Sequence, residues 1–326
     1  MRAFRTVLTG LLVMLLGLAA PAVAHPTAGP AGGAQAQAPV TAAGERQTRS
    51  DVLDIGDPDT SPPGSNDWSC TPDEEHPDPV VLVHGLAATQ AANWQMFAPR
   101  LAEEGYCVFS LTYGVKDGVS TPLYTPGGMT TMEASAEELA AFVDEVRAET
   151  GAEQVDLVGH SQGTLMPSYY VHFLDGADHV DSYISLTPLW EGTALLGLDS
   201  LYAYAEVLGL HPVVDLALDQ VCESCSQFLR GSDFLKRLHA KGTFDPDVRY
   251  TNIVTRYDEL VVPYTSGIAH GENITNIVLQ DECARDLSGH AGVAFNPNAL
   301  DHVLNALDPE HAEPVPCRFV SPIGAP

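Results

Sequence analysis

The chain has 326 residues, of which 45% are hydrophobic, and its 43 acidic and 15 basic residues give a net charge of −28. This length and apolar content suffice for the core of one domain, and no internal repeat is visible. So acidic a surface repels nucleic-acid phosphates and anionic membranes, which argues against a nucleic-acid partner. A need for solubility is enough to explain the acidity of the chain.

The amino terminus predicts export. Arg2 and Arg5 form a short basic region, Val7 to Ala20 is apolar, and small residues lead to a cleavage site after Ala24. This is the pattern of a secretory signal peptide. The apolar stretch has 14 residues, fewer than the about 20 that span a bilayer. We therefore expect a signal peptide at residues 1–24 and a secreted, extracellular protein.

A leader follows the signal peptide. Its first part is rich in Ala, Gly, Pro and Gln without apolar periodicity, which predicts disorder. Residues 46–63 are also turn-rich, so composition does not mark the end of the leader sharply. We expect a disordered leader at residues 25–63 and a folded domain at residues 64–326.

Strand and helix patterns alternate through the folded domain. Alternation of this kind predicts an α/β fold, with a mostly parallel sheet covered by helices on both faces. Gly105 and Gly151 mark helix ends, and residues 114–131 form a long loop rich in Gly, Pro and Thr. The predicted strands are 80–84, 107–111, 155–158, 180–186, 250–255 and 274–279, and the predicted helices are 93–104, 135–150, 164–174 and 298–307.

One stretch, about residues 190–242, is apolar and helical and contains no clear strand. We expect a helical cap or lid inserted above the strand ends, where it would form a wall for an acyl chain. The alternative is that its apolar stripes are ordinary core packing, which is the usual role of such stripes.

The pentapeptide Gly159-His160-Ser161-Gln162-Gly163 directly follows the third predicted strand. It fits G-x-S-x-G, the nucleophile elbow, in which a sharp strand-to-helix turn exposes a serine and the glycines let strand and helix approach closely. A lone match is a common string, but here a strand precedes it and a helix follows it. The serine is therefore the candidate nucleophile.

A serine hydroxyl needs a histidine to take its proton and a carboxylate to orient that histidine. On this type of fold the acid and then the histidine follow the serine along the chain. Asp258 lies just after the strand at 250–255 and is the candidate acid, with its neighbour Glu259 as the rival. His290, in the loop between the last strand and the last helix, is the candidate base.

Two main-chain N–H groups are candidates for the oxyanion hole, which must offer preorganised donors to the developing negative oxygen. One belongs to Gln162, immediately after the serine, and the other to Leu86, in the loop after the first strand. His84 ends that strand, and we expect it to shape the loop rather than to act as a base.

Six cysteines in an exported chain predict three disulfides. One pair would join the starts of two neighbouring strands, one would close a local C-x-x-C bridge of structural rather than redox type, and one would join the remaining two. These pairs are Cys70–Cys107, Cys222–Cys225 and Cys283–Cys317. No second C-x-x-C or paired histidines accompany them, so no metal is expected.

Several further motifs accompany the elbow between about Cys70 and Cys317, and the set as a whole resembles the secreted bacterial class 2 lipases. The resemblance implies an α/β-hydrolase fold and cleavage of acylglycerol esters without an organic cofactor. It also implies Ser161, Asp258 and His290 as nucleophile, acid and base. The motifs are Val80 to Gly85, Asn93-Trp94, Gly105 to Phe109, Val155 to Gly163, Gly231 to Leu235 and Asp258 to Pro263.

The chain departs from the family pattern at two positions. Leu86 stands where a threonine is common, so only a backbone donor is expected there, and Thr164 stands where a second glycine is common. We expect a secreted lipase that forms an acyl-enzyme, acts on lipid or other ester substrates, with a lipid–water interface as a candidate place of action, and is a monomer. Alternatives with the same triad are a carboxylesterase, a polyester or cutin hydrolase and an acyltransferase; a non-enzymatic binding module is disfavoured.

Overall fold

The computed structural model describes residues 54–194 and 219–324. The expected signal peptide, the leader up to residue 53 and the middle of the expected insertion lie outside the described residues. Six strands form one parallel sheet in the order β2-β1-β3-β4-β5-β6. They are β1 (Val80–Val83), β2 (Val108–Leu111), β3 (Val155–His160), β4 (Val180–Leu186), β5 (Arg249–Val254) and β6 (Ile274–Val278).

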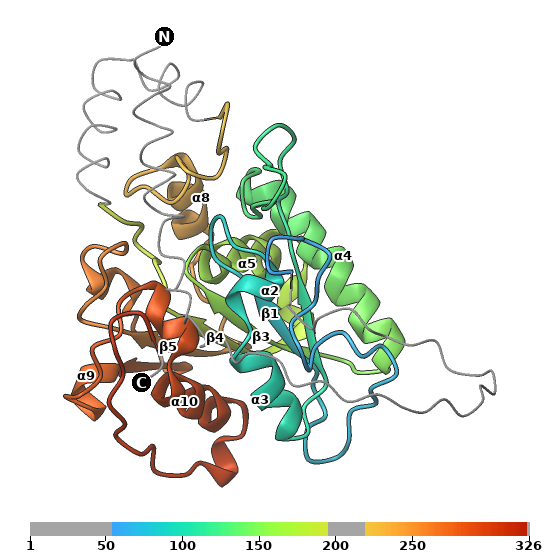
Figure 1. Cartoon of the computed structure of the whole chain (residues 1–326), viewed down its shortest axis with the longest axis vertical. Helices are drawn as coiled ribbons and strands as arrows, with labels where there is room; N and C mark the ends of the chain where they lie inside the picture. Colours follow the sequence, from blue (N-terminus) through green and yellow to red (C-terminus); the bar gives the residue numbers. More distant parts are fainter. Residues whose placement is uncertain (1–53, 195–218, 325–326) are drawn as a thin grey trace, which may run out of the picture. The chain divides into compact units, whose positions relative to one another are not determined.

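Helices cover both faces of this sheet, as the alternating pattern predicts: α3 and α10 lie on one side, and α4 and α5 on the other (Figure 1). The helices are α2 (Gln90–Asn93), α3 (Phe97–Glu103), α4 (Met132–Thr150), α5 (Gln162–Phe173), α8 (Asp233–Lys241), α9 (Leu279–Glu282) and α10 (Pro297–Leu307). The short 3₁₀ helices are η1 (Gly176–His179), η3 (Tyr264–Gly267), η4 (Ala291–Phe295) and η5 (Pro309–His311).

The two faces of the sheet carry two apolar clusters, because successive strand side chains point to opposite faces. Along β1, Val81 and Val83 pack in the cluster with α4, α5 and α8, whereas Val80 and Leu82 pack in the cluster with α3 and α10. All four side chains are fully buried. This accounts for the continuous apolar run in the sequence, which is typical of a parallel strand buried on both faces.

The single helix predicted over residues 93–104 is wrong. The structure has two helices, α2 and α3, separated at residues 94–96. Thr89 caps α2 earlier than predicted, since its hydroxyl accepts the N–H of Ala92 at 3.0 Å. Pro99 favours the break: it sits in the first turn of α3, where its missing N–H is tolerated, whereas inside one long helix it would remove a hydrogen bond and crowd the preceding turn.

Residues 54–63, predicted from their composition to belong to the leader, pack against the domain. The carbonyl of Ile55 accepts the hydroxyl of Thr89 at 2.7 Å, and the carbonyl of Pro58 accepts the side-chain amide of Gln90 at 3.0 Å. These polar contacts form in spite of the turn-rich composition, because the buried side chains of Thr89 and Gln90 are donors that need partners.

Apolar side chains in the described part of the expected insertion pack in the core. Trp190, Phe228 and Phe234 are buried in the cluster that includes α5. This matches the core-packing alternative for these residues. The acyl-chain wall expected from the same stretch falls on residues 195–218, outside the described residues.

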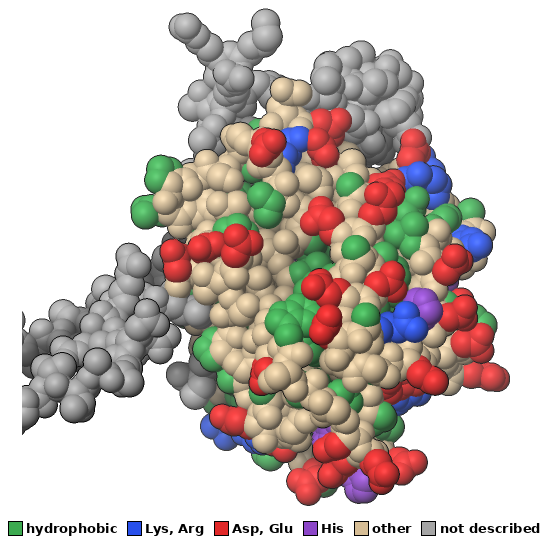
Figure 2. All heavy atoms as spheres, turned by 90° about the vertical axis from the view of Figure 1, so that its right-hand side faces the viewer, with side chains coloured by type: hydrophobic (Ala, Val, Ile, Leu, Met, Phe, Trp, Pro, Cys, Tyr) green, Lys and Arg blue, Asp and Glu red, His purple; other side chains and the backbone are tan. Residues whose placement is uncertain are grey.

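Among the described residues, no helix is both long and apolar enough to cross a membrane. The acidity expected from composition is visible on one face in Figure 2, where Asp and Glu side chains lie dispersed and outnumber Lys and Arg. Dispersed like charges favour solubility over binding of a single cationic partner.

Three disulfides are present, Cys70–Cys107, Cys222–Cys225 and Cys283–Cys317, and they are the pairs that the sequence favours. The last one ties the carboxyl-terminal tail to the segment that leads to His290. In that segment, the main-chain N–H groups of Leu287 and Gly289 donate to carbonyls of the tail at 3.0 and 2.8 Å. The tail therefore supports the loop that carries the candidate base.

Removing this tether should lower both stability and activity. In the chain-entropy description, closing 34 residues stabilises by about 4 kcal/mol, so Cys283→Ser with Cys317→Ser should lose about that much unfolding free energy in urea. The bridge between Cys70 and Cys107 closes 37 residues at the amino-terminal end of β2 and is a matched control. Both double variants should be similarly destabilised, but the first should be less active while still folded. Equal activity of the two folded variants would contradict this prediction.

Candidate active site

The candidate site lies at the carboxyl edge of the sheet. The loop after β1 carries Leu86, Ser161 directly follows β3, the loop after β5 carries Asp258, and the segment after α9 carries His290. Because all six strands are parallel, their carboxyl ends share one edge, which is where ligand sites form in open α/β sheets. The structure thus brings together residues far apart in the sequence.

Ser161 occupies a strained turn between β3 and α5, with φ 55° and ψ −122°. A non-glycine residue rarely adopts positive φ, and such strain persists only where the surroundings enforce it. The flanking glycines are needed for space: a Cβ on Gly159 would lie 2.0 Å from the carbonyl oxygen of Gly163, and one on Gly163 would lie 2.2 Å from that of Val83. This is the geometry of a nucleophile elbow.

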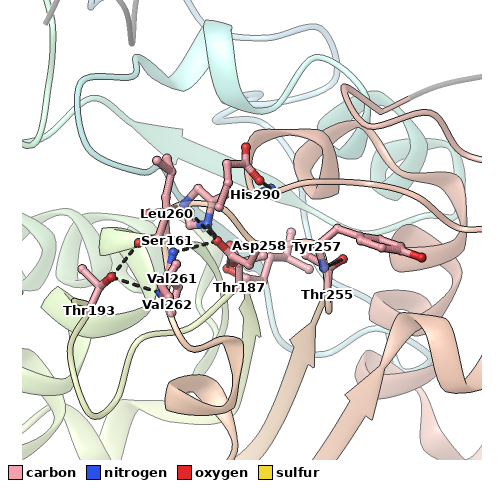
Figure 3. A network of polar contacts seen from close by, with 12 residues as sticks. Ser161, Thr187, Thr193, Thr255, Tyr257, Asp258, Leu260, Val261, Val262 and His290 are labelled. Atoms are coloured by element: carbon pink, nitrogen blue, oxygen red, sulfur yellow. Dashed lines mark hydrogen bonds and ion pairs between the residues drawn. The ribbon is translucent and has the colours of Figure 1, made fainter. Parts of the chain in front are cut away.

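The hydroxyl of Ser161 meets the imidazole of His290, with 2.7 Å between Oγ and Nε2. On the other side of the ring, Nδ1 lies 3.0 and 2.9 Å from the two carboxylate oxygens of Asp258 (Figure 3). The His290 and Asp258 side chains are almost fully buried, at 4% and 2% exposure. A carboxylate placed this way orients the imidazole and stabilises it when protonated.

The carboxylate of Asp258 is also fixed from its own turn. Its Oδ1 accepts the main-chain N–H groups of Leu260 and Val261 at 3.0 and 2.7 Å (Figure 3). The hydroxyl of Thr193 braces the same turn by donating to the carbonyl of Leu260 at 2.6 Å and accepting the N–H of Val262 at 3.1 Å. These donors hold the buried carboxylate in one orientation.

Glu259, the rival acid, does not face the ring nitrogen. Its Oε2 accepts the main-chain N–H of His290 at 2.9 Å. In the structure, the imidazole of His290 pairs with Asp258 and the main chain of His290 pairs with Glu259.

The first-strand loop packs directly against the elbow. A Cβ on Gly85 would lie 3.1 Å from the Cβ of Ser161. His84 shapes this loop, since its Nδ1 lies 2.7 Å from the carbonyl of Gly85 and its Nε2 accepts the N–H of Tyr113 at 3.3 Å. Burial lowers the pKa of His84 to about 4, so the ring is neutral at ordinary pH. The geometry fits the structural role expected for it.

The N–H groups of Leu86 and Gln162 donate to no other group within the described ranges. The side chain of Gln162 is buried and its Nε2 donates to the carbonyl of Gly128 at 2.9 Å. The same carbonyl accepts the hydroxyl of Ser224 at 2.7 Å, beside the Cys222–Cys225 bridge. These contacts fix the residue after the serine while leaving its N–H available.

Three polar groups around the site were not found by sequence reasoning. His160 is buried, with Nε2 3.1 Å from the carbonyl of His290. The side-chain oxygen Oδ1 of Asn93 lies 2.9 Å from Nδ1 of His160. Asp286, also buried, accepts Ser288 N–H and Oγ at 3.1 and 2.6 Å and so supports the loop before the base. Asn93 and His160 lie inside quoted motifs, but no local pattern signals their pairing.

The parallel sheet, the helices on both faces and the serine in its strand-to-helix elbow define an α/β-hydrolase. The chain belongs to the class 2 lipase family, whose profile, described as "Lipase (class 2)", matches residues 77–300. Over 99 residues it is 37% identical to a triacylglycerol lipase of Pseudarthrobacter phenanthrenivorans and to another of Burkholderia plantarii. Each match covers 28% of this chain, and 27% and 24% of those proteins.

Among solved structures, the crystal structure of Aspergillus fumigatus lipase B is similar in fold, with a TM-score of 0.56 and 20% sequence identity. The similarity covers 78% of this chain and 57% of that chain. Matches to the curated relatives span only about a quarter of their lengths, and the similarity to the solved lipase concerns the fold.

Proposed function

We propose that this protein is a secreted lipase that hydrolyses carboxylic esters of acylglycerols through an acyl-enzyme. Ser161 attacks the ester carbonyl, and His290 takes the hydroxyl proton and passes it to the departing alcohol. Asp258 orients the imidazole and stabilises its positive charge. The observation that carries the proposal is the 2.7 Å contact between Ser161 Oγ and His290 Nε2, with Asp258 2.9 Å from the other ring nitrogen.

The second half of the reaction uses the same groups in reverse. His290 takes a proton from water, the resulting hydroxide attacks the acyl carbonyl, and the proton returns to Ser161 as the carboxylic acid leaves. We assign the oxyanion hole to the N–H groups of Leu86 and Gln162. Their lack of other acceptors among the described residues supports this assignment. No step requires an organic cofactor.

Membership of the class 2 lipases supports an acylglycerol substrate. Secretion is supported by two features: the amino-terminal pattern ending at Ala24 and the three disulfides. Disulfides form and persist in oxidising compartments outside the cytosol.

Chain length distinguishes a lipase from a short-chain esterase. Each methylene buried in an acyl groove stabilises the bound ester by about 0.8 kcal/mol until the groove is full. The purified enzyme should therefore prefer p-nitrophenyl octanoate over acetate by more than about tenfold in kcat/KM, and it should hydrolyse emulsified triolein. Fastest cleavage of acetate without activity on triolein would leave a short-chain esterase.

A further inference from the structure

We propose that Glu259 is a positioning residue for the base: its carboxylate holds the main-chain N–H of His290, while His160 holds the carbonyl of the same residue. The imidazole is then aimed from its own backbone as well as by Asp258. This inference rests on the proposed function and adds to it a residue that contacts neither the substrate nor the reacting atoms.

The contact on the N–H side is specific. Glu259 Oε2 lies 2.9 Å from the main-chain nitrogen of His290. The carboxylate also packs closely on the preceding residue, because a Cβ added to Gly289 would lie 2.6 Å from the same oxygen. A glycine at this position therefore lets the carboxylate reach the main chain. A hydrogen bond from an N–H to a charged acceptor is stronger than one to a neutral acceptor.

The contact on the carbonyl side comes from a different element. His160, the last residue of β3, has Nε2 3.1 Å from the carbonyl oxygen of His290. Burial first, and then the positive charge of His290, lower the pKa of His160 to about 3. The neutral ring has a single N–H and both of its nitrogens face oxygen acceptors; the proposal places the proton on Nε2, where it is donated to the carbonyl of His290. Asn93 Oδ1 lies 2.9 Å from Nδ1, and because an amide oxygen only accepts, this second contact is not a hydrogen bond while the proton is on Nε2.

The two contacts fix one residue from opposite sides. His290 stands just before η4, at the end of a segment that the tail supports. With its N–H and its carbonyl both held, the Cα–Cβ bond has a set direction, and the remaining side-chain torsions are set by Ser161 and Asp258. Small errors in this alignment slow catalysis strongly, since about 1 Å of misplacement lowers the reaction rate by about a hundredfold.

A competing role for Glu259 is purely electrostatic, because a second carboxylate near the imidazole would favour its protonated form. The charged and titratable groups that face His290 are Asp258, Glu259 and His160. The two roles differ in what they require of the side chain: positioning requires an oxygen acceptor, whereas the electrostatic role requires a negative charge.

Three variants separate the two roles: Glu259→Ala, Glu259→Gln and, as a control for loss of an exposed carboxylate, Glu272→Ala. Glu259→Ala should lower kcat on a soluble p-nitrophenyl ester by about ten- to a hundredfold with KM nearly constant. Glu259→Gln keeps an oxygen acceptor and should restore most of the lost kcat, with the acid limb of the pH–rate profile unmoved. The control should behave as the parent enzyme.

The parent enzyme must first hydrolyse the ester, and Ser161→Ala must abolish this hydrolysis. If the parent enzyme shows no such hydrolysis, the proposed function fails. In an enzyme that meets these conditions, two outcomes overturn the inference alone. One is a Glu259→Ala variant as active as the parent. The other is a Glu259→Gln variant as impaired as Glu259→Ala, with the acid limb shifted to lower pH, which would assign Glu259 an electrostatic role.

Discussion

Replacing Ser161 by alanine is expected to lower kcat by about 10⁵- to 10⁶-fold while leaving the fold intact. The variant removes the only atom proposed to bond to the acyl group, and the oxyanion hole and substrate binding supply the small remaining rate. Hydrolysis of p-nitrophenyl esters and emulsified triolein would measure the loss, with circular dichroism and thermal unfolding to establish that the variant is folded.

Thr164→Ser is a suitable control on the same helix, because it retains the hydroxyl that donates to the carbonyl of Ser161 at 2.7 Å. It should keep activity near that of the parent enzyme. More than a few per cent of activity in a folded, purified Ser161→Ala protein would mean that the nucleophile lies elsewhere.

Replacing Asp258 by asparagine should lower kcat by about 10⁴-fold, the second largest effect expected. Asparagine preserves the shape of the side chain and can still accept the N–H groups of Leu260 and Val261. Its amide would present a donor to Nδ1 of His290, so the neutral ring would carry its proton on Nε2, facing Ser161. A ring in that tautomer cannot accept the serine proton.

Asp247→Asn is the matched control for this variant, because the residue is exposed and lies at the opposite end of β5. It should leave kcat unchanged. If Glu259→Gln proved more damaging than Asp258→Asn, the acid would be Glu259, in spite of the 2.9 Å contact between Asp258 and the ring.

Local sequence patterns predict most of the strands and helices of this fold. The strands are short and rich in β-branched and aromatic residues, so all six were recognisable, and β4 has the bounds that its run predicts. Gly151 adopts φ 76° and ends α4, as a glycine after a helical stretch indicates. The helix at 93–104 failed because the apolar pattern was weighed without Pro99, whose backbone chemistry decides where a helix begins.

The sequence by itself determined the parallel sheet, the elbow and the order in which Ser161, Asp258 and His290 follow one another. Each of these depends on residues that are neighbours in the chain or on the direction of the strands. Only the tertiary structure decided which of two adjacent carboxylates meets the imidazole and which meets the main chain of the same histidine. Neighbouring side chains in a turn point in different directions, and the packing of Glu259 against Gly289 sets those directions. The contact of His160 with the carbonyl of His290 joins residues 130 positions apart, a pairing that no local pattern encodes.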